Sequence, residues 1–205
     1  MVIIIKMKKD EIKQKIALFS HKSVGIAGAG GLGSNVAVAL ARSGLLHLVV
    51  VDFDKVDESN LNRQYYFRSQ VGKEKITALK ENIENINSSV ICDFQNIKLH
   101  KGSMWKPFQY VDIVVEALDS AEIKTQFIEE ILQNLPNKPI VAASGVAGIG
   151  NSDRIYTKKL GNLYLVYDEE AKSSDEDILL APKVCLFANW QANIVLELLS
   201  NEDVP

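Results

Sequence analysis

Apolar and polar positions alternate along the chain in the order that a parallel α/β fold produces. Short continuous apolar runs, typical of strands buried on both faces of a sheet, are separated by stretches with helical periodicity. The predicted strands cover residues 24–27, 46–51, 90–94, 111–117 and 140–143, and the predicted helices cover residues 10–20, 34–43, 73–87, 121–135 and 183–200. This order predicts an α/β chain with a Rossmann-like, mostly parallel sheet flanked by helices.

The C-terminal third of the chain has a different pattern. Residues 144–152 are small and rich in glycine, and two short segments, 154–156 and 163–167, have the composition of antiparallel strands. An acidic stretch, residues 168–177, follows them. We therefore expect antiparallel strands to be added to the sheet in this part of the chain, followed by a loop.

The composition favours one cytoplasmic domain and excludes several classes of protein. The 205 residues are 47% hydrophobic, enough for the core of a single α/β domain. The formal charge of -3 gives little support to a nucleic-acid partner. Cys92 and Cys185 form no CxxC pair, so we expect neither a disulfide scaffold nor a thiolate zinc site. The apolar start, residues 1–5, is too short for a signal peptide or a membrane span.

A glycine-rich turn joins the first buried strand to the next helix. Residues 28–33, Gly-Ala-Gly-Gly-Leu-Gly, match GxGxxG. Without side chains at Gly28 and Gly30 the backbone can turn tightly and approach phosphates, which the free amides at the helix start then face. A tight turn without a ligand is the alternative. A P-loop is excluded, because it needs a lysine after the last glycine and Ser34 stands there.

An acidic residue ends the second predicted strand. Asp52 follows Gly33 by 19 residues, and an acid at about that separation commonly binds ribose hydroxyls in dinucleotide folds. NAD and ATP both fit the glycine-rich turn and Asp52. An NAD-dependent oxidoreductase, however, leaves the polar residues 59–64 that follow without an explanation.

The segment that begins at Asp52 explains these polar residues through a resemblance. Residues 52–64 read Asp-Phe-Asp-Lys-Val-Asp-Glu-Ser-Asn-Leu-Asn-Arg-Gln. They resemble the family of ThiF, MoeB and the ubiquitin-activating enzymes, whose members share a GxGGLGS loop, a DxD at the end of the second strand and an SNLxRQ segment. Residues 71–75 are similar to the family's VGxxK, residues 115–119 to its strand-ending aspartate, and Ala181-Pro182 to its last landmark. The resemblance runs from about residue 23 to residue 199.

The resemblance implies an ATP site with Mg²⁺. Asp52 would hold the ribose, Asn60 and Arg63 would contact the phosphates, Lys75 would neutralise charge there, and Asp119 would carry Mg²⁺ through ATP. Arg63, Lys75 and Asp119 are the implied catalytic residues. The implied nucleotide-binding residues, with Asp54 in a supporting role, are Gly28, Gly30, Gly31, Gly33, Asp52, Asp54, Ser59, Asn60, Arg63, Gln64, Lys75 and Asp119.

The activity that the resemblance implies is adenylation of the C-terminal glycine of a small ubiquitin-like sulfur-carrier protein, similar to ThiS, for thiamine thiazole biosynthesis. A C-terminal carboxylate titrates near pH 3.5, so at pH 7 it needs no general base. It needs relief from repulsion between anions, which Arg, Lys and Mg²⁺ supply. His21, His47 and His100 accordingly stand in no catalytic motif.

The chain departs from the family pattern in three ways. It lacks the two CxxC pairs that bind a structural zinc in many relatives. Residues 168–180, where the ubiquitin-activating relatives have a thioester cysteine, contain none, and Cys185 lies later in an apolar setting where we expect a small buried hydrophobe. Residues 8–20 lack the arginine that reaches the partner subunit in longer relatives. These departures resemble a compact ThiF subgroup that forms an acyl adenylate and no enzyme thioester.

The resemblance also implies the organisation of the chain and leaves other readings open. Residues 1–205 would be one adenylation domain, with a nucleotide-binding half at about 23–120 and a carrier-binding and dimer part at about 140–205. Relatives are usually homodimers. Residues 168–177 would be a mobile flap over the carrier's tail or a solvated loop. The acceptor could instead be a molybdopterin-type carrier, a peptide or a tRNA carboxylate, and an inactive scaffold subunit is a further alternative.

Overall fold

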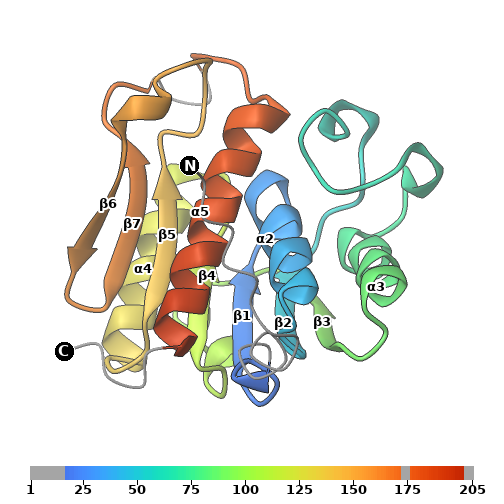
Figure 1. Cartoon of the computed structure of the whole chain (residues 1–205), viewed down its shortest axis with the longest axis horizontal. Helices are drawn as coiled ribbons and strands as arrows, with labels where there is room; N and C mark the ends of the chain where they lie inside the picture. The colour runs from blue at the N-terminus through green and yellow to red at the C-terminus, as the bar shows by residue number, and fades with distance from the viewer. Residues whose placement is uncertain (1–16, 172–175, 201–205) are drawn as a thin grey trace, which may run out of the picture.

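The computed structural model describes residues 17–171 and 176–200, which form one seven-stranded sheet with helices on both faces (Figure 1). The strands are β1 (Ser23–Ala27), β2 (His47–Asp52), β3 (Ile91–Asn96), β4 (Ile113–Glu116), β5 (Ile140–Ser144), β6 (Ile155–Leu160) and β7 (Leu163–Asp168). The helices are α2 (Gly31–Arg42), α3 (Lys75–Ile86), α4 (Ala121–Asn134) and α5 (Ala181–Ser200). Within the described ranges, no helix has both the length and the apolar character that crossing a bilayer requires.

The predicted α/β architecture is confirmed. Every pair of neighbouring strands is parallel except β6 and β7, the two strands expected to be antiparallel. Each of the other elements expected from the hydrophobic pattern is present, with its ends moved by a few residues. The helix predicted over residues 10–20 lies mostly outside the described residues.

Alternate residues of the central strands enter two apolar cores, one on each face of the sheet. Ile26 and Val115 pack with residues of α2 and α5 on one face, while Ala27 and Val114 pack with Phe127 of α4 on the other. All five side chains are fully buried. The period of two that places neighbours on opposite faces of a strand therefore explains why these strands are apolar throughout.

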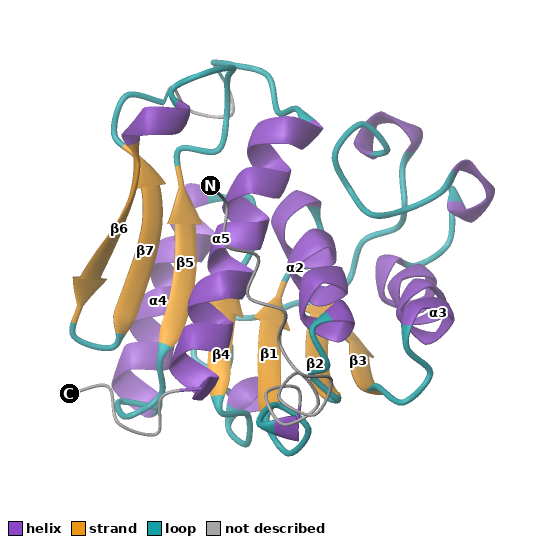
Figure 2. Cartoon of the chain, viewed as in Figure 1, coloured by secondary structure: helices purple, strands orange, loops and turns teal. Residues whose placement is uncertain are grey.

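The direction of the chain reverses in the middle of the sheet, whose strand order is β3-β2-β1-β4-β5-β7-β6. The chain moves outward from β1 to β3 and then returns to β4 on the other side of β1. The parallel strands all end at one edge of the sheet (Figure 2). Loops that leave β1 and β4 there diverge, and such a switch point is where open α/β sheets bind ligands.

The two C-terminal strands join the sheet in reversed order. The second of them, β7, pairs in parallel with β5, so the earlier strand β6 forms the edge of the sheet. Lys158 and Lys159 lie on that edge and are exposed, which disfavours pairing with another chain.

A buried ion pair ties the end of β7 to the start of α5. Lys183 Nζ lies 2.9 Å from Asp168 Oδ2 and donates a second hydrogen bond, of 2.8 Å, to the carbonyl oxygen of Ala147. The Asp168 side chain is inaccessible and that of Lys183 is 7% exposed. Burial by itself raises the pKa of the Asp168 carboxyl, but hydrogen bonds from Lys183 and from Glu170 N outweigh it and hold this pKa below its usual value.

We predict that Lys183→Met lowers the free energy of unfolding by about 3 kcal/mol, because it leaves a buried carboxylate without its cation. Urea unfolding at pH 7 measures the loss.

The lowered pKa of Asp168 stabilises the native state at pH values above the unfolded pKa of about 3.9. This contribution to stability is lost as the pH falls through the lower pKa of the folded state.

Lys159→Met is the matched control, since Lys159 is exposed on the edge strand, and it should change stability by less than about 0.5 kcal/mol. The double variant Asp168→Leu/Lys183→Met should recover most of the loss, because it removes both charges. Equal effects of the two single lysine variants would contradict a stabilising role for the buried pair.

Candidate functional site

The glycine-rich turn between β1 and α2 contains glycines with two different roles. Gly28 has φ 95°, and a Cβ there would lie 2.5 Å from the Ala117 carbonyl oxygen; a Cβ at Gly33 would lie 1.9 Å from the Gly28 oxygen. These two glycines are required by the fold. At Gly30, by contrast, the nearest atom to a Cβ would be Gln64 Nε2 at 3.8 Å. The surface at Gly30 is therefore open to a ligand as well as to a side chain.

The carboxylate of Asp52 fastens this turn to the end of β2. Its Oδ2 accepts a 2.6 Å hydrogen bond from Ala29 N and its Oδ1 a 2.7 Å bond from Asp54 N. Tyr66, which sequence reasoning missed, donates a 2.7 Å bond to the carbonyl oxygen of Ala29. Burial, with the nearby Asp52 charge, raises the pKa of Tyr66 well above its usual value, so the phenol remains a donor.

The segment from residue 53 to residue 74, here called the crossover segment, is a loop closed at its base. Its two ends meet through hydrogen bonds from Val56 N to Lys73 O and from Lys75 N to the carbonyl oxygen of Asp54, at 2.8 and 2.9 Å. Lys75 Nζ then lies 2.9 Å from Asp54 Oδ2, with its side chain only 7% exposed. The Lys75 ammonium group is thus oriented by Asp54, the residue to which the sequence assigned a supporting role.

The middle of the crossover segment is bound to α2. Asn35 Nδ2 donates hydrogen bonds to the carbonyl oxygens of Gly31 and Arg63, at 2.7 and 3.0 Å, and Ser34 Oγ accepts one of 3.0 Å from Tyr65 N. No binding or catalytic role was predicted for Asn35 or Ser34. Their bonds place the Arg63 backbone beside the glycine-rich turn.

The side chains of Arg63 and Gln64 face that turn. A Cβ on Gly31 would lie 3.7 Å from Arg63 Cγ, while Arg63 Nη1 donates a 2.8 Å bond to Asn62 Oδ1. Gln64 is 9% exposed, and its Oε1 has no hydrogen-bond partner within the described part of the chain. An unsatisfied buried acceptor costs about 1–3 kcal/mol, so a water or a ligand group that donates to this oxygen would be favoured.

Two predicted site residues lie at the start of the crossover segment. Ser59 Oγ and Ser59 N both donate to Asp57 Oδ1, at 2.5 and 2.8 Å, and these bonds lower the pKa of the exposed Asp57 carboxyl. The hydroxyl of Ser59 is thus directed to Asp57. The carbonyl oxygen of Asn60 accepts a 3.0 Å bond from Gln64 N, so Asn60 supports the turn that presents Gln64.

The last predicted residue, Asp119, follows β4. It is exposed, and the two residues before it contact the turn, since a Cβ on Gly28 would lie 3.5 Å from Leu118 N. Glu116 Oε1 accepts a 2.7 Å bond from Leu118 N, and Lys124 Nζ lies 2.9 Å from Glu116 Oε2. Burial raises the pKa of the Glu116 carboxyl, an effect that Lys124 opposes.

The residues fit a nucleotide with its metal better than a metal alone. Among the described residues no three His, Cys, Asp or Glu side chains gather in a group that could hold a metal ion. Mg²⁺ is commonly held by one or two carboxylates together with substrate phosphates. Asp119 beside an open glycine-rich turn matches that arrangement.

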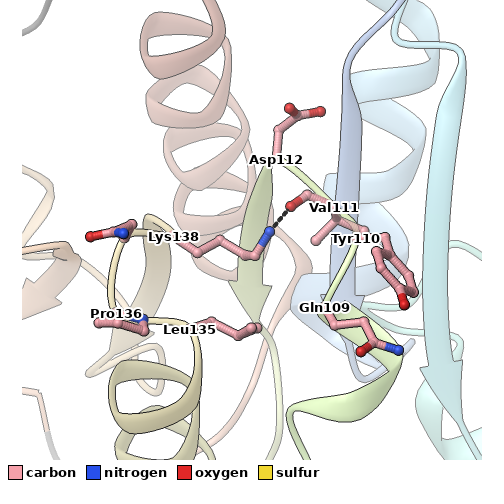
Figure 3. A pocket seen from close by; sticks show the side chains of 8 residues that line it. Gln109, Tyr110, Val111, Asp112, Leu135, Pro136 and Lys138 are labelled. Carbon is pink, nitrogen blue, oxygen red and sulfur yellow. Dashed lines mark hydrogen bonds between the residues drawn. The ribbon is translucent and has the colours of Figure 1, made fainter.

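An open pocket of about 500 Å³ lies elsewhere, between the residues that precede β4 and those that precede β5 (Figure 3). In it Lys138 donates a hydrogen bond to the carbonyl oxygen of Val111. The parallel strands begin at this edge of the sheet and the glycine-rich turn lies at the other. The pocket is therefore separate from the site predicted from the sequence.

Residues 7–205 match the model of the ThiF family. The chain belongs to the ThiF family. The adenylyltransferase and sulfurtransferase MOCS3 of Caenorhabditis briggsae is 34% identical over 127 residues, which are 62% of this chain and 31% of that protein. The tRNA threonylcarbamoyladenosine dehydratase of Bacillus subtilis is 32% identical over 139 residues, 66% of this chain and 53% of that protein. The chain thus spans about a third to about half of these ThiF-family relatives.

The fold agrees with this membership. The tRNA N6-threonylcarbamoyladenosine dehydratase TcdA of E. coli, solved in complex with AMP, superposes with a TM-score of 0.82 at 22% identity over 91% of this chain and 89% of that one. E. coli MccB, solved with ATP, gives a TM-score of 0.72 at 21% identity over 93% of this chain and 60% of that one. At these identities the likeness concerns the fold.

We predict that Gly33→Ala lowers the free energy of unfolding by roughly 2 kcal/mol or more, because its Cβ would meet backbone that cannot move aside. Gly30→Ala should cost less than about 1 kcal/mol, since its Cβ meets only ordinary contacts. Urea unfolding of both variants compares them directly. Equal destabilisation by the two changes would show that the division of the glycines is wrong.

Proposed function

We propose that the chain is an ATP-dependent adenylyltransferase that activates the C-terminal glycine carboxylate of a small ubiquitin-like sulfur-carrier protein similar to ThiS, and releases pyrophosphate. The observation that carries this proposal is the placing of Arg63 and Gln64 against the glycine-rich turn by the crossover segment. A dinucleotide oxidoreductase could use an arginine there only to bind its cofactor, since hydride transfer develops no charge on the phosphates. Phosphoryl chemistry requires one, or an equivalent cation.

The nucleotide site follows from the turn and the two strand ends beside it. Gly28, Gly30, Gly31 and Gly33 form the surface for the phosphates. Gln64 Oε1 offers an acceptor, and Asp52 retains free lone pairs beside its two backbone bonds, so it can still accept from a ribose hydroxyl. The structures of TcdA with AMP and with ATP support an adenine nucleotide.

The chain's own groups lower the barrier by stabilising charge. The acceptor carboxylate forms a bond from oxygen to the α-phosphorus, and the bond to the bridging oxygen breaks, so pyrophosphate leaves with the electron pair. Arg63 and Lys75 reduce repulsion between the anions, and Asn60 and Ser59 shape the turn beside them. Asp119 would hold Mg²⁺, which would supply further positive charge on the phosphates.

The acceptor class is supported by what several relatives are called. The Caenorhabditis briggsae relative is named adenylyltransferase and sulfurtransferase, and another, from Caenorhabditis elegans, is ubiquitin-like modifier-activating enzyme 5, 30% identical over 117 residues. MccB was solved together with MccA. Burial raises the pKa of the half-buried Cys185 thiol, which makes it a poor nucleophile and favours an adenylate product without an enzyme thioester.

A tRNA acceptor is the second candidate, because the Bacillus subtilis relative and TcdA are tRNA threonylcarbamoyladenosine dehydratases. The formal charge of -3 disfavours it, since tRNA binding relies on a basic surface.

We propose that residues 1–205 act as one domain, with nucleotide binding in about 23–120 and carrier binding and dimer formation in about 140–205. A cytoplasmic homodimer serving thiamine biosynthesis is part of the same proposal.

The deciding experiment is ATP–pyrophosphate exchange with and without a carrier protein that ends in Gly-Gly. We expect exchange that depends on the carrier, because pyrophosphate can leave and labelled pyrophosphate can bind and reverse the step while the adenylated carrier stays bound. Measurable ATP binding without exchange, but with AMP formation on addition of tRNA, would replace the carrier by the tRNA acceptor. Tight NAD binding without ATP binding would overturn the adenylyltransferase.

We predict that Arg63→Ala lowers the rate of carrier-dependent exchange by roughly 100-fold or more, because one cation that stabilises transferring charge is removed. The matched control is Arg68→Ala in the same crossover segment, whose side chain is 86% exposed and pairs only loosely with Glu58 at 3.7 Å. It should leave the rate within about twofold. Loss of activity in both variants, or in neither, would exclude the specific role of Arg63.

A further inference from the structure

β4 and β5 pair over only two positions, Val114 with Ile140 and Val115 with Val141. Beyond them a buried and a partly buried polar side chain connect the strand ends. Gln191 Nε2 of α5 donates to the carbonyl oxygens of Glu116 and Val141, at 3.1 and 3.3 Å. Lys124 Nζ of α4 donates a 2.6 Å bond to the carbonyl oxygen of Ala143.

A fully buried carboxylate lies at the centre of this cluster. The side chain of Glu116 is 0% exposed and that of Lys124 is 20% exposed. A buried carboxylate without a cation tends to take up a proton instead of keeping its charge. The position of Lys124, 2.9 Å away, opposes this uptake and favours the charged form of Glu116, and an anionic acceptor binds a backbone N–H about twice as strongly as a neutral one.

The N–H that Glu116 binds belongs to Leu118, the residue before Asp119. On the other side of Asp119, Ser120 caps α4 by accepting a hydrogen bond from Ile123 N. Asp119 is thus held between an anchored amide and a capped helix start. The carbonyl oxygen of Ala117, in the same turn, also lies against Gly28.

We propose that Glu116 and Lys124 are positioning residues that fix the turn of residues 117–119 and so hold Asp119 at the glycine-rich turn. That the pair fixes this turn rests on the described contacts alone. That the fixed turn serves Mg²⁺–ATP rests on the proposed function. The two parts are tested separately, so failure of one is distinguishable from failure of the other.

The first test uses NMR to measure the hydrogen-exchange rates of single amides in the protein without ligand. In Lys124→Met the Leu118 amide should exchange about tenfold faster, because the cation that favours the charged form of its acceptor, Glu116, is lost. The adjacent amide of Ala117, bonded to the carbonyl oxygen of Ala27 at 2.9 Å, should keep its rate. Lys124→Arg should restore slow exchange of Leu118, and Lys80→Met, in an exposed pair with Glu84, should change neither amide.

Equal acceleration of Leu118 and Ala117 would overturn the proposal, because it would mean general loosening of the fold. An unchanged Leu118 rate in a folded Lys124→Met variant would overturn it as well. If that variant does not fold, Glu116→Gln/Lys124→Met removes both charges. A Leu118 amide that then exchanges as slowly as in the unaltered protein would show that the pair does not fix the turn.

The second test is the affinity for ATP with and without Mg²⁺. Mg²⁺ should increase the affinity for ATP, and we expect this increase to be smaller by roughly tenfold or more in Lys124→Met. Asp119→Asn should reduce the increase in the same way, and the double variant should reduce it no further. A Mg²⁺ gain that survives in Lys124→Met, or losses that add in the double variant, would remove the positioning role. Absence of ATP binding in the unaltered protein would overturn the proposed function, while the exchange of Leu118 still decides the geometry.

Discussion

The Cα of Gly33 lies so close to the carbonyl oxygen of Gly28 that a methyl group would stand 1.9 Å from it. This approach lets α2 begin at once after β1, and it brings the turn against Ala117 at the end of β4. The ends of the two strands that flank the switch point are therefore in direct backbone contact through Gly28. Asp52, Asp119 and the crossover segment all take their positions relative to that contact.

The crossover segment has only two short 3-10 turns, Glu58–Asn60 and Arg68–Gln70, yet its middle is fixed. Short polar side chains do this by bonding to its backbone: Asn35 to Arg63, Ser34 to Tyr65, and Asn82 of α3 to the carbonyl oxygen of Tyr65 at 2.9 Å. Each bond uses a side chain with few rotatable bonds, so little conformational entropy is lost. An arginine on such a loop can then be as well placed as one on a helix.

The strands and helices were predictable because they depend on local pattern, while the site positions remain a prediction from motif spacing. Buried parallel strands are apolar throughout, and Arg63 lies in a motif whose spacing can be read directly. The place of β7 beside β5 was not predictable, because strand pairing depends on distant partners. Tyr66 and Glu116 were missed for a similar reason: a tyrosine in a polar loop and a glutamate at a strand end give no sign of burial until their partners, Ala29 and Lys124, are known.

Two lysines near helix starts show how the loops at the C-terminal ends of the strands are held rigid. Lys124 lies in the first turns of α4 and Lys183 in those of α5, where the helix dipole disfavours a cation. Each is paired at 2.9 Å with a buried carboxylate at a strand end, Glu116 or Asp168. The unfavourable position is thus offset by a specific partner. Because an unpaired buried charge is far more costly than the pair, each helix start has one stable register against its strand, and the turn that carries Asp119 is held by the first of these pairs.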